Sequence, residues 1–338
     1  MIKKIFISTL FVCIATAVIA QEKTQNAVKS DSVKKLSRYE KLFDKKKNVK
    51  TTVGVITLHN VDGKVYFELP VNVIGRSFLM SSVVDNVSDM SLGYVGQRTS
   101  RPTQICFTKT DSLVQIRLVP APKIVDSDDK GIQDAVNRSS LPSILSSSPI
   151  LAFNNDSTAV VFDATPFFVS GSKYIGSLNA SSFGGFIQKV SSFSKDLSAL
   201  KDIESYDDNI AIISNMTYTF KTYFLGMESG GQEYLTVDLR TTLSLLPEVS
   251  FKYRLADYRI GTGVTEFEKF NSKEQGSQIS YMANRWRIES GKPIVFYVDT
   301  LFIPAWREAI KKGLTKWNEA FEKIGFKDVI KVYDYPTK

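Results

Sequence analysis

Short apolar runs separated by polar stretches recur through most of the chain, and this spacing is typical of a β-rich protein. Residues 53–58 and 64–69 are two such runs, and the Asp-Gly step at residues 62–63 between them favours a tight hairpin turn. Polar and apolar residues alternate at 115–119 and 216–220, as they do in half-buried strands. The sequence therefore predicts strands through most of the middle of the chain.

Two helices and one loop are expected to interrupt this pattern. A helix is predicted at residues 128–138 and a second helix at residues 191–202. Residues 139–148 are rich in serine, which favours a loop before a short strand at 150–153.

The pattern changes after Pro293. Residues 294–298 form an unbroken apolar run, which is typical of a buried strand. Pro304 then opens a helix with apolar residues spaced by three and four, and Gly325 is placed to end it. These apolar positions are Ile310, Leu314, Trp317, Phe321 and Ile324.

Residues 329–333 follow that helix as a second strand, so the segment predicts a strand–helix–strand unit with a right-handed crossover. We expect Trp317 and Phe321 to pack in its core. Two strands cannot bury both faces of their own sheet, so the unit is expected to be incomplete.

The first twenty residues predict a cleavable secretion signal. Lys3 and Lys4 precede an apolar run, and small residues stand before Gln21. A membrane anchor is the alternative, but the apolar run is short for a membrane span. A lipoprotein site at Cys13 is disfavoured because bulky residues come directly before it. We therefore expect an exported protein, located in the periplasm, at the cell surface or outside the cell, with no stable membrane span.

The net charge of +8 falls to +6 when Lys3 and Lys4 are removed with the signal. Much of the excess lies in residues 34–50, without the interleaved aromatic residues that a nucleic-acid surface favours. This stretch predicts a solvated, partly helical leader and no nucleic-acid partner.

Nitrogen and sulfur ligands are scarce. The chain has one histidine, His59, and Cys106 is its only cysteine after the signal. A structural or catalytic zinc site needs several such ligands, and Ser-His-Asp catalysis needs an imidazole beside the nucleophile. We therefore predict no metal, cofactor or catalytic site, with Cys106 in the core and His59 at the surface or in a turn.

Other groups carry weaker signals. Asp163, Asp238 and Glu248 could supply a general acid–base pair, but a chain of this size has many carboxylates. The acidic doublets at 128–129 and 207–208 lack the spacing of a calcium loop, and the glycine pairs at 183–186 and 229–231 are too sparse to hold phosphate, so all four predict turns. Three aromatic residues predict packing rather than a sugar platform: Tyr218, Tyr223 and Phe224.

Three stretches near the C-terminus resemble the entry to the catalytic domain of bacterial exported zinc-dependent metalloproteases of the metzincin type. These are Asn-Arg-Trp-Arg-Ile-Glu at 284–289, Lys-Pro-Ile-Val-Phe-Tyr-Val-Asp at 292–299, and the segment 306–327, which contains Trp-Asn-x-Ala-Phe-Glu-x-x-Gly-Phe at 317–326.

Earlier stretches resemble the two accessory domains that begin these proteases. They are residues 65–70 and 75–79 for a small first domain, and residues 251–261 for the close of a middle domain. In that family the zinc and the catalytic glutamate are held by a later His-Glu-x-x-His helix, which this chain lacks, so no residue here inherits a catalytic or zinc-binding role.

The resulting expectation is an α+β chain with β-rich accessory domains before an incomplete zincin-like α/β start. The predicted ranges are 1–20 signal, 21–50 Lys-rich leader, 51–89 small β-rich domain, 90–290 β-rich middle domain and 291–338 truncated catalytic-domain start.

The resemblance implies the accessory region of an exported zinc metalloprotease, inactive as a peptidase itself, with protein or peptide substrates and zinc belonging to a full-length relative. The alternative is a stand-alone exported β-rich protein that binds a protein or glycan. An enzyme that uses only carboxylates has no positive support in the sequence.

Overall fold

The computed structural model describes residues 36–336 except 45–47, 177, 179–181, 184–186, 249–250, 272–275 and 290. The predicted signal and residues 21–35 of the predicted leader lie outside the described residues. The protein is β-rich, as expected, and 48% of the described residues are in strands and 14% in helices. Its chain forms two compact units, which we call the two-sheet unit (residues 1–118 and 144–246) and the mixed unit (residues 119–143 and 247–338).

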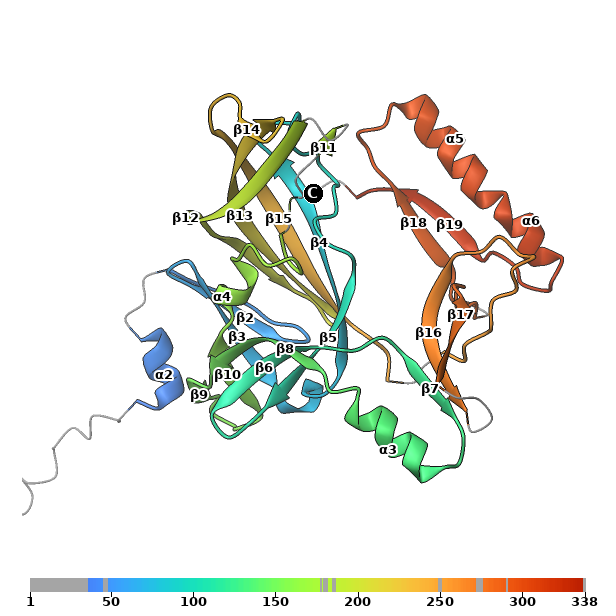
Figure 1. The fold of residues 1–338 in the computed structure, drawn as a ribbon, viewed down its shortest axis with the longest axis horizontal. Helices are drawn as coiled ribbons and strands as arrows, with labels where there is room; N and C mark the ends of the chain where they lie inside the picture. Colours follow the sequence, from blue (N-terminus) through green and yellow to red (C-terminus); the bar gives the residue numbers. More distant parts are fainter. Residues whose placement is uncertain are drawn as a thin grey trace, which may run out of the picture. The chain divides into compact units, whose positions relative to one another are not determined.

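A five-stranded sheet forms one layer of the two-sheet unit (Figure 1). Its strands, in spatial order, are β1 (Val49–Thr52), β2 (Thr57–Val61), β3 (Lys64–Pro70), β10 (Ala159–Asp163) and β9 (Ala152–Phe153).

The predicted hairpin at residues 62–63 is confirmed in this sheet. β2 and β3 are antiparallel, with Val61 opposite Lys64 and His59 opposite Tyr66. Asp62 and Gly63 have φ angles of 51° and 79°, the left-handed conformation that a tight two-residue hairpin turn requires.

The second layer is a nine-stranded sheet. Its strands, in spatial order, are β11 (Ser182–Phe183), β12 (Ile187–Ser205), β13 (Asn209–Phe224), β15 (Glu233–Leu245), β4 (Ser77–Val87), β5 (Thr103–Lys109), β6 (Leu113–Leu118) and β8 (Ser143–Pro149), with β14 (Met227–Glu228) paired to β13. The unit is completed by the helices α2 (Arg38–Phe43) and α4 (Thr165–Phe168) and the short 3₁₀ turn η1 (Val71–Val73).

One apolar core lies between these two sheets. Strand β3 alternates buried and partly exposed residues, so Val65, Phe67 and Leu69 all point into the core. The Phe67 ring lies 5.6 Å from Phe162 on β10 and 6.3 Å from Phe107 on β5, centroid to centroid. Aromatic contacts of this kind join the two sheets into a single packed layer.

Two sequence predictions fail in the second sheet. Residues 191–202 belong to strand β12 and not to a helix, because β12 pairs with β13 along its length and carries bulges after Ser194 and Leu200 that disturb its alternation. The Ser-rich residues 143–149 form strand β8 beside β6 and not a loop, because pairing with a neighbouring strand overrides their local preference.

The mixed unit contains a three-stranded sheet of β17 (Ser277–Ala283), β16 (Val264–Asn271) and β7 (Lys123–Asp126). Helix α3 (Lys130–Arg138) follows β7, which confirms the helix predicted at 128–138. Asp129 caps it, since its side chain accepts a hydrogen bond from the backbone N–H of Gly131 at 2.7 Å.

The strand–helix–strand prediction is also confirmed in this unit (Figure 1). Strands β18 (Ile294–Val298) and β19 (Ile330–Asp334) are parallel, and the helices α5 (Pro304–Thr315) and α6 (Trp317–Glu322) connect them. The predicted single helix is therefore divided at Lys316. Gly325 has a φ of 93°, the left-handed conformation expected of a residue that ends a helix.

The prediction that Trp317 packs in a core is wrong. Its side chain is 62% exposed, and Phe321 is only partly buried. Helix α5 does contact β18 and β19, and Ile310, Leu314 and Phe321 are half-buried, whereas Trp317 and Ile324 remain exposed. The apolar periodicity thus predicted the helix correctly, but it did not show which of the helix's apolar side chains are buried.

The limits predicted for the domains remain predictions, although strand pairing runs across one of them. β4 lies before residue 90 and pairs with β15, which lies far beyond it, so both belong to the same sheet.

Candidate functional site

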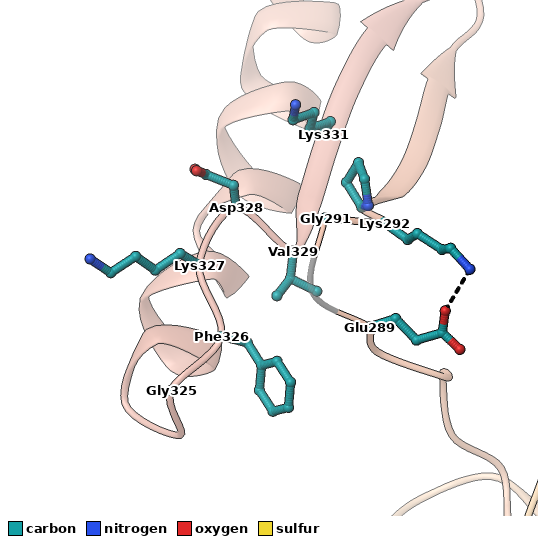
Figure 2. Close-up of a pocket in the computed structure, with 10 residues that line it drawn as sticks. Glu289, Gly291, Lys292, Gly325, Phe326, Lys327, Asp328, Val329 and Lys331 are labelled. Atoms are coloured by element: carbon teal, nitrogen blue, oxygen red, sulfur yellow. Dashed lines mark hydrogen bonds and ion pairs between the residues drawn. The ribbon is translucent and has the colours of Figure 1, made fainter.

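A surface cavity of about 530 Å³ lies in the mixed unit, beside the beginnings of β18 and β19 (Figure 2). Two loops form it. Its lining residues are Glu289, Gly291, Lys292, Pro293, Gly325, Phe326, Lys327, Asp328, Val329 and Lys331.

Local interactions hold each of these loops. Gly291 has a φ of 78°, and the backbone N–H of Lys292 donates to the carbonyl of Glu289 at 3.2 Å, which closes a tight turn. On the other side, the Asn318 side chain donates to the carbonyl of Ile330 at 3.0 Å and accepts from its N–H at 2.8 Å. These two bonds fix the start of β19 to helix α6.

Glu289 is the centre of charge in this cavity. Its carboxylate pairs with Lys292 Nζ at 2.7 Å and with Arg287 Nε at 2.5 Å. The hydrogen bond from Lys292 and the positive charges of both partners hold the pKa of Glu289 below its ordinary value. Figure 2 shows Lys327 and Asp328 pointing away from Glu289.

The geometry does not suit catalysis. Among the described residues that line the cavity there is no serine, threonine, cysteine or histidine, and its Glu289 carboxylate is held ionised by two cations. The cavity also lies at the amino ends of β18 and β19, whereas ligands of parallel sheets bind outside the carboxyl ends. These features favour a role in binding over a role in catalysis.

A second hollow of about 610 Å³ adjoins the first, and Phe326 lines both. Its other lining residues come from three segments, which are the stretch between β15 and β16, the stretch between β17 and β18, and the end of α6 with the turn that follows it. They are Phe251, Arg254, Asn284, Arg285, Trp286, Ile288, Phe321 and Ile324. Sequence analysis missed this site because these three segments lie far apart along the chain.

The carboxylates considered as an acid–base pair are not brought together. Asp163 ends β10 in the first sheet, where its side chain accepts from the N–H of Thr165 at 2.9 Å and lies 4.0 Å from Lys64 Nζ. Asp238 lies on β15 in the second sheet, and Glu248 follows that strand. Each carboxylate has its own structural environment, and the structure shows no acid–base pair formed by these three.

Asp238 is instead the centre of a polar cluster. Its side chain is almost fully buried and accepts hydrogen bonds from Lys201 Nζ at 2.6 Å, Asn86 Nδ2 at 2.8 Å and Asn215 Nδ2 at 3.0 Å. Burial alone raises the pKa of Asp238, but these three hydrogen bonds outweigh it, so the pKa lies below its ordinary value. The cluster ties together strands β4, β12, β13 and β15.

The prediction for His59 is wrong. His59 lies on β2 with only 5% of its surface exposed, instead of at the surface or in a turn. One ring nitrogen, Nδ1, lies 2.9 Å from Thr51 Oγ1, and the other, Nε2, lies 3.1 Å from Glu68 Oε2. The Phe43 ring covers the imidazole, at 4.5 Å between centroids.

His59 is buried because helix α2 packs on the outer face of the first sheet. The Tyr39 hydroxyl donates to Glu68 Oε2 at 2.8 Å, so Tyr39 and His59 share one carboxylate. Burial and this hydrogen bond raise the pKa of Tyr39 to about 12. The predicted leader is thus partly helical, as expected, but residues 38–43 are docked rather than solvated.

Cys106 lies buried on β5, as predicted, and burial raises the pKa of its thiol. The high pKa keeps the thiol protonated and unreactive. Tyr218 is also buried, and its hydroxyl donates to the carbonyl of Gly176 at 2.7 Å, which confirms a packing role. Tyr223 and Phe224 lie at the end of β13, where Phe224 is exposed.

Of the two acidic doublets, only residues 207–208 lie in a bend, whereas residues 128–129 directly precede helix α3. Asp129 caps helix α3, and residues 207–208 lie between β12 and β13. The described part of the chain holds no group of three or more histidine, cysteine, aspartate or glutamate residues that could bind a metal ion. Residues 184–186 of the first glycine pair lie outside the described residues, and residues 229–231 lie in the bend before β15.

No helix in the described ranges has the length and apolar character needed to cross a bilayer.

Two families match the chain. The family described as Domain of unknown function (DUF5118) matches residues 36–87, and the family described as Domain of unknown function (DUF5117) matches residues 96–291. The second match covers more than half of the chain, so the chain belongs to the DUF5117 family. No curated protein and no solved structure matches it.

Proposed function

We propose that this chain is the accessory region of an exported zinc-dependent metalloprotease, joined to the beginning of its catalytic domain, and that the chain alone has no peptidase activity. The motifs at residues 284–299 and 317–326 suggest this family. The observation that carries the proposal is an open face on the parallel sheet of β18 and β19.

That open face consists of aromatic and aliphatic side chains. Tyr297 on β18 lies opposite Tyr333 on β19, with ring centroids 6.2 Å apart, and Tyr335 continues the row. All three tyrosines and the nearby Val295 are exposed. Parallel sheets are normally covered on both faces, so this unit has the character of one part of a larger α/β domain.

The opposite face of the same sheet is covered. Asp334 at the end of β19 pairs with Lys311 Nζ at 3.0 Å and Arg307 Nη1 at 3.4 Å, both on helix α5. One face therefore meets a helix and the other meets none among the described residues. This asymmetry supports a strand–helix–strand start to which further elements of a catalytic domain are added.

The test compares the chain with a longer version that continues into the downstream coding sequence. We expect that sequence to contain a His-Glu-x-x-His motif, and we expect the extended protein to bind one zinc ion and to cleave casein. The chain ending at Lys338 should do neither, as measured by metal analysis and by release of peptides. Stoichiometric zinc together with cleavage by the shorter chain would refute the proposal, and so would a downstream sequence without the motif.

A stand-alone exported binding protein is the second candidate, and the continuous core of the two-sheet unit favours it. Deleting residues 291–338 distinguishes the two. If the tail is the start of a larger domain, its removal should reduce aggregation and dye binding to apolar surface. A full chain that is already monomeric, with one cooperative melting transition that the deletion lowers, would favour the binding protein.

A further inference from the structure

The second hollow of the mixed unit has an unusual combination of side chains. Six of its lining residues are aromatic or aliphatic, and three are polar: Arg254, Asn284 and Arg285. All three polar residues can donate hydrogen bonds from their side chains, and none of the described lining residues is acidic.

The two arginines have no carboxylate partner among the described residues. The Arg285 guanidinium lies over the Phe251 ring, 4.0 Å from its centroid, and donates to the carbonyl of Lys252 at 2.5 Å. This stacking holds the guanidinium at the rim of the hollow while its charge stays uncompensated. Arg287 differs, because it is paired with Glu289.

Asn284 adds a third donor beside these charges. The side-chain oxygen of Asn284 accepts a hydrogen bond from Thr265 Oγ1 at 2.7 Å, which fixes the orientation of the amide group. The NH₂ of the same amide is then available to donate hydrogen bonds. The hollow thus presents donors and positive charge around an apolar floor.

The apolar floor is open to solvent. Trp286 is 62% exposed and Ile324 is 66% exposed. Pockets for small molecules bury most of their ligand and close around it, whereas peptide grooves leave such anchors accessible along one side. Trp286 is nevertheless held in place, since its ring lies 6.0 Å from that of Phe296 on β18, edge to face. A fixed tryptophan beside free arginines is a composition typical of binding hot spots.

We propose that this hollow, which we call the Trp286 groove, binds a short acidic segment of another polypeptide that carries an aromatic or aliphatic side chain. The apolar side chain packs against Trp286, Phe321 and Ile324. The flanking carboxylates pair with Arg254 and Arg285. The inference concerns binding only and does not depend on the protease proposal.

The experiment measures the fluorescence anisotropy of fluorescein-labelled peptides mixed with the full chain. The full chain is purified in the form that its expression host produces, after any cleavage by that host. The probe Asp-Glu-Phe-Asp-Leu-Glu should bind and should lose affinity as salt is raised, because its charge pairs are solvent-accessible. Two control peptides should bind at least roughly tenfold more weakly: Lys-Arg-Phe-Lys-Leu-Arg, which reverses the charge, and Asp-Glu-Ser-Asp-Ser-Glu, which removes the apolar anchors.

Variants of the chain locate the site. Arg254→Gln should weaken binding of the acidic probe roughly tenfold by removing one charge pair. Ile324→Glu should weaken it at least as much, through repulsion at an exposed position that does not threaten folding. The matched control is Arg259→Gln, because Arg259 is exposed, already pairs with Asp257 and does not line the groove. This control should bind within about twofold of the parent chain.

Three results would overturn the proposal. The first is an acidic probe that binds no better than the two control peptides. The second is binding by Arg254→Gln and Ile324→Glu that equals binding by Arg259→Gln. The third is a dimer of the chain, seen by sedimentation, that Ile324→Glu dissociates, because a second copy then occupies the groove. None of these results bears on zinc binding or cleavage by an extended protein.

Discussion

The two units of this protein differ in how completely they bury their apolar residues. In the two-sheet unit, both sheets contribute to one continuous core. In the mixed unit, only five apolar residues among the described positions are buried: Val136, Phe267, Val298, Val329 and Ile330. The first unit is stabilised by its own packing, while the second presents apolar surface that other structure can cover.

The two units also differ in their polar interactions. The two-sheet unit buries polar groups in complete clusters, such as Asp238 with its three donors and Glu68 with His59 and Tyr39. In the mixed unit the ion pairs are at least partly exposed, as between Lys292 and Glu289, and two arginines of the groove have no carboxylate partner among the described residues. Buried clusters specify a fold, whereas exposed and unpaired charges are available to ligands.

The distribution of tryptophan makes this comparison measurable. All three tryptophans, Trp286, Trp306 and Trp317, belong to the mixed unit. Tryptophan fluorescence therefore follows unfolding of the mixed unit alone, whereas far-ultraviolet circular dichroism reports mainly on the longer strands of the two-sheet unit.

The largest effect is expected from Phe67→Ala. This ring packs against Phe107, Phe162 and Phe168 in the centre of the core, so its loss should lower the free energy of unfolding of the two-sheet unit by about 3–5 kcal/mol. In urea, the transition seen by circular dichroism should shift while the fluorescence transition stays in place.

The matched control for this change is Trp317→Ala, at an exposed position on α6, which should alter the free energy of unfolding by less than about 0.5 kcal/mol. Its fluorescence transition is then followed through the two remaining tryptophans. If Phe67→Ala moved both transitions equally, the two units would unfold as one, and the comparison between them would fail.

A smaller effect is expected from Asp238→Asn. Both Asp238 oxygens accept from donors, so the new amide N–H₂ must face a donor in place of an acceptor. At neutral pH this should cost the two-sheet unit about 1–3 kcal/mol, measured by urea unfolding. The exposed Asp207→Asn, at the turn between β12 and β13, is the control and should leave stability unchanged.

The difference in unfolding free energy between the parent chain and Asp238→Asn should depend on pH in a definite direction. The pKa of Asp238 is lower in the folded protein than its ordinary value of 3.8, so folding favours the carboxylate. The stabilisation is fully present above the unfolded pKa and disappears as the pH falls through the folded pKa. The stability gap between the parent chain and Asp238→Asn should therefore be constant down to about pH 4 and shrink below it. A gap that widened in acid would show that Asp238 is protonated in the folded state.

Local signals in the sequence predicted the fold well where structure depends on neighbours along the chain. The Asp-Gly turn at 62–63, the cap of α3 and the break at Gly325 all depend on a few adjacent residues. Residues 191–202 were misread because their strand is defined by pairing with β13, including the shift after Ser194. Long-range pairing of this kind leaves only a weak trace in one sequence.

The sites were harder to predict for the same reason. His59 is buried by helix α2, which carries Phe43 and Tyr39. That helix belongs to a Lys-rich segment whose charge predicted exposure to solvent. The Trp286 groove joins residues that follow β15, residues before β18 and residues at the end of α6, and only the fold brings them together. The absence of histidine ligands was visible in the sequence because it depends on composition alone.

The smallest effect is expected from Tyr297→Ser, on the open face of β18. Tyr297 is exposed beside Tyr333 and Tyr335, so its removal should change the free energy of unfolding of the mixed unit by less than about 0.5 kcal/mol. Binding of an apolar dye such as anilinonaphthalene sulfonate should nevertheless fall, because the aromatic row is interrupted.

Tyr258, which is exposed and lies outside this aromatic row, supplies the control, since Tyr258→Ser should leave both stability and dye binding unchanged. A loss of about 2 kcal/mol or more from Tyr297→Ser would mean that the open face is covered in solution. In an extended protein, however, that larger loss is the expected result, because added elements would bury Tyr297. The loss of unfolding free energy caused by Tyr297→Ser, compared between the chain and the extended protein, therefore shows whether further elements of a larger domain cover the open face.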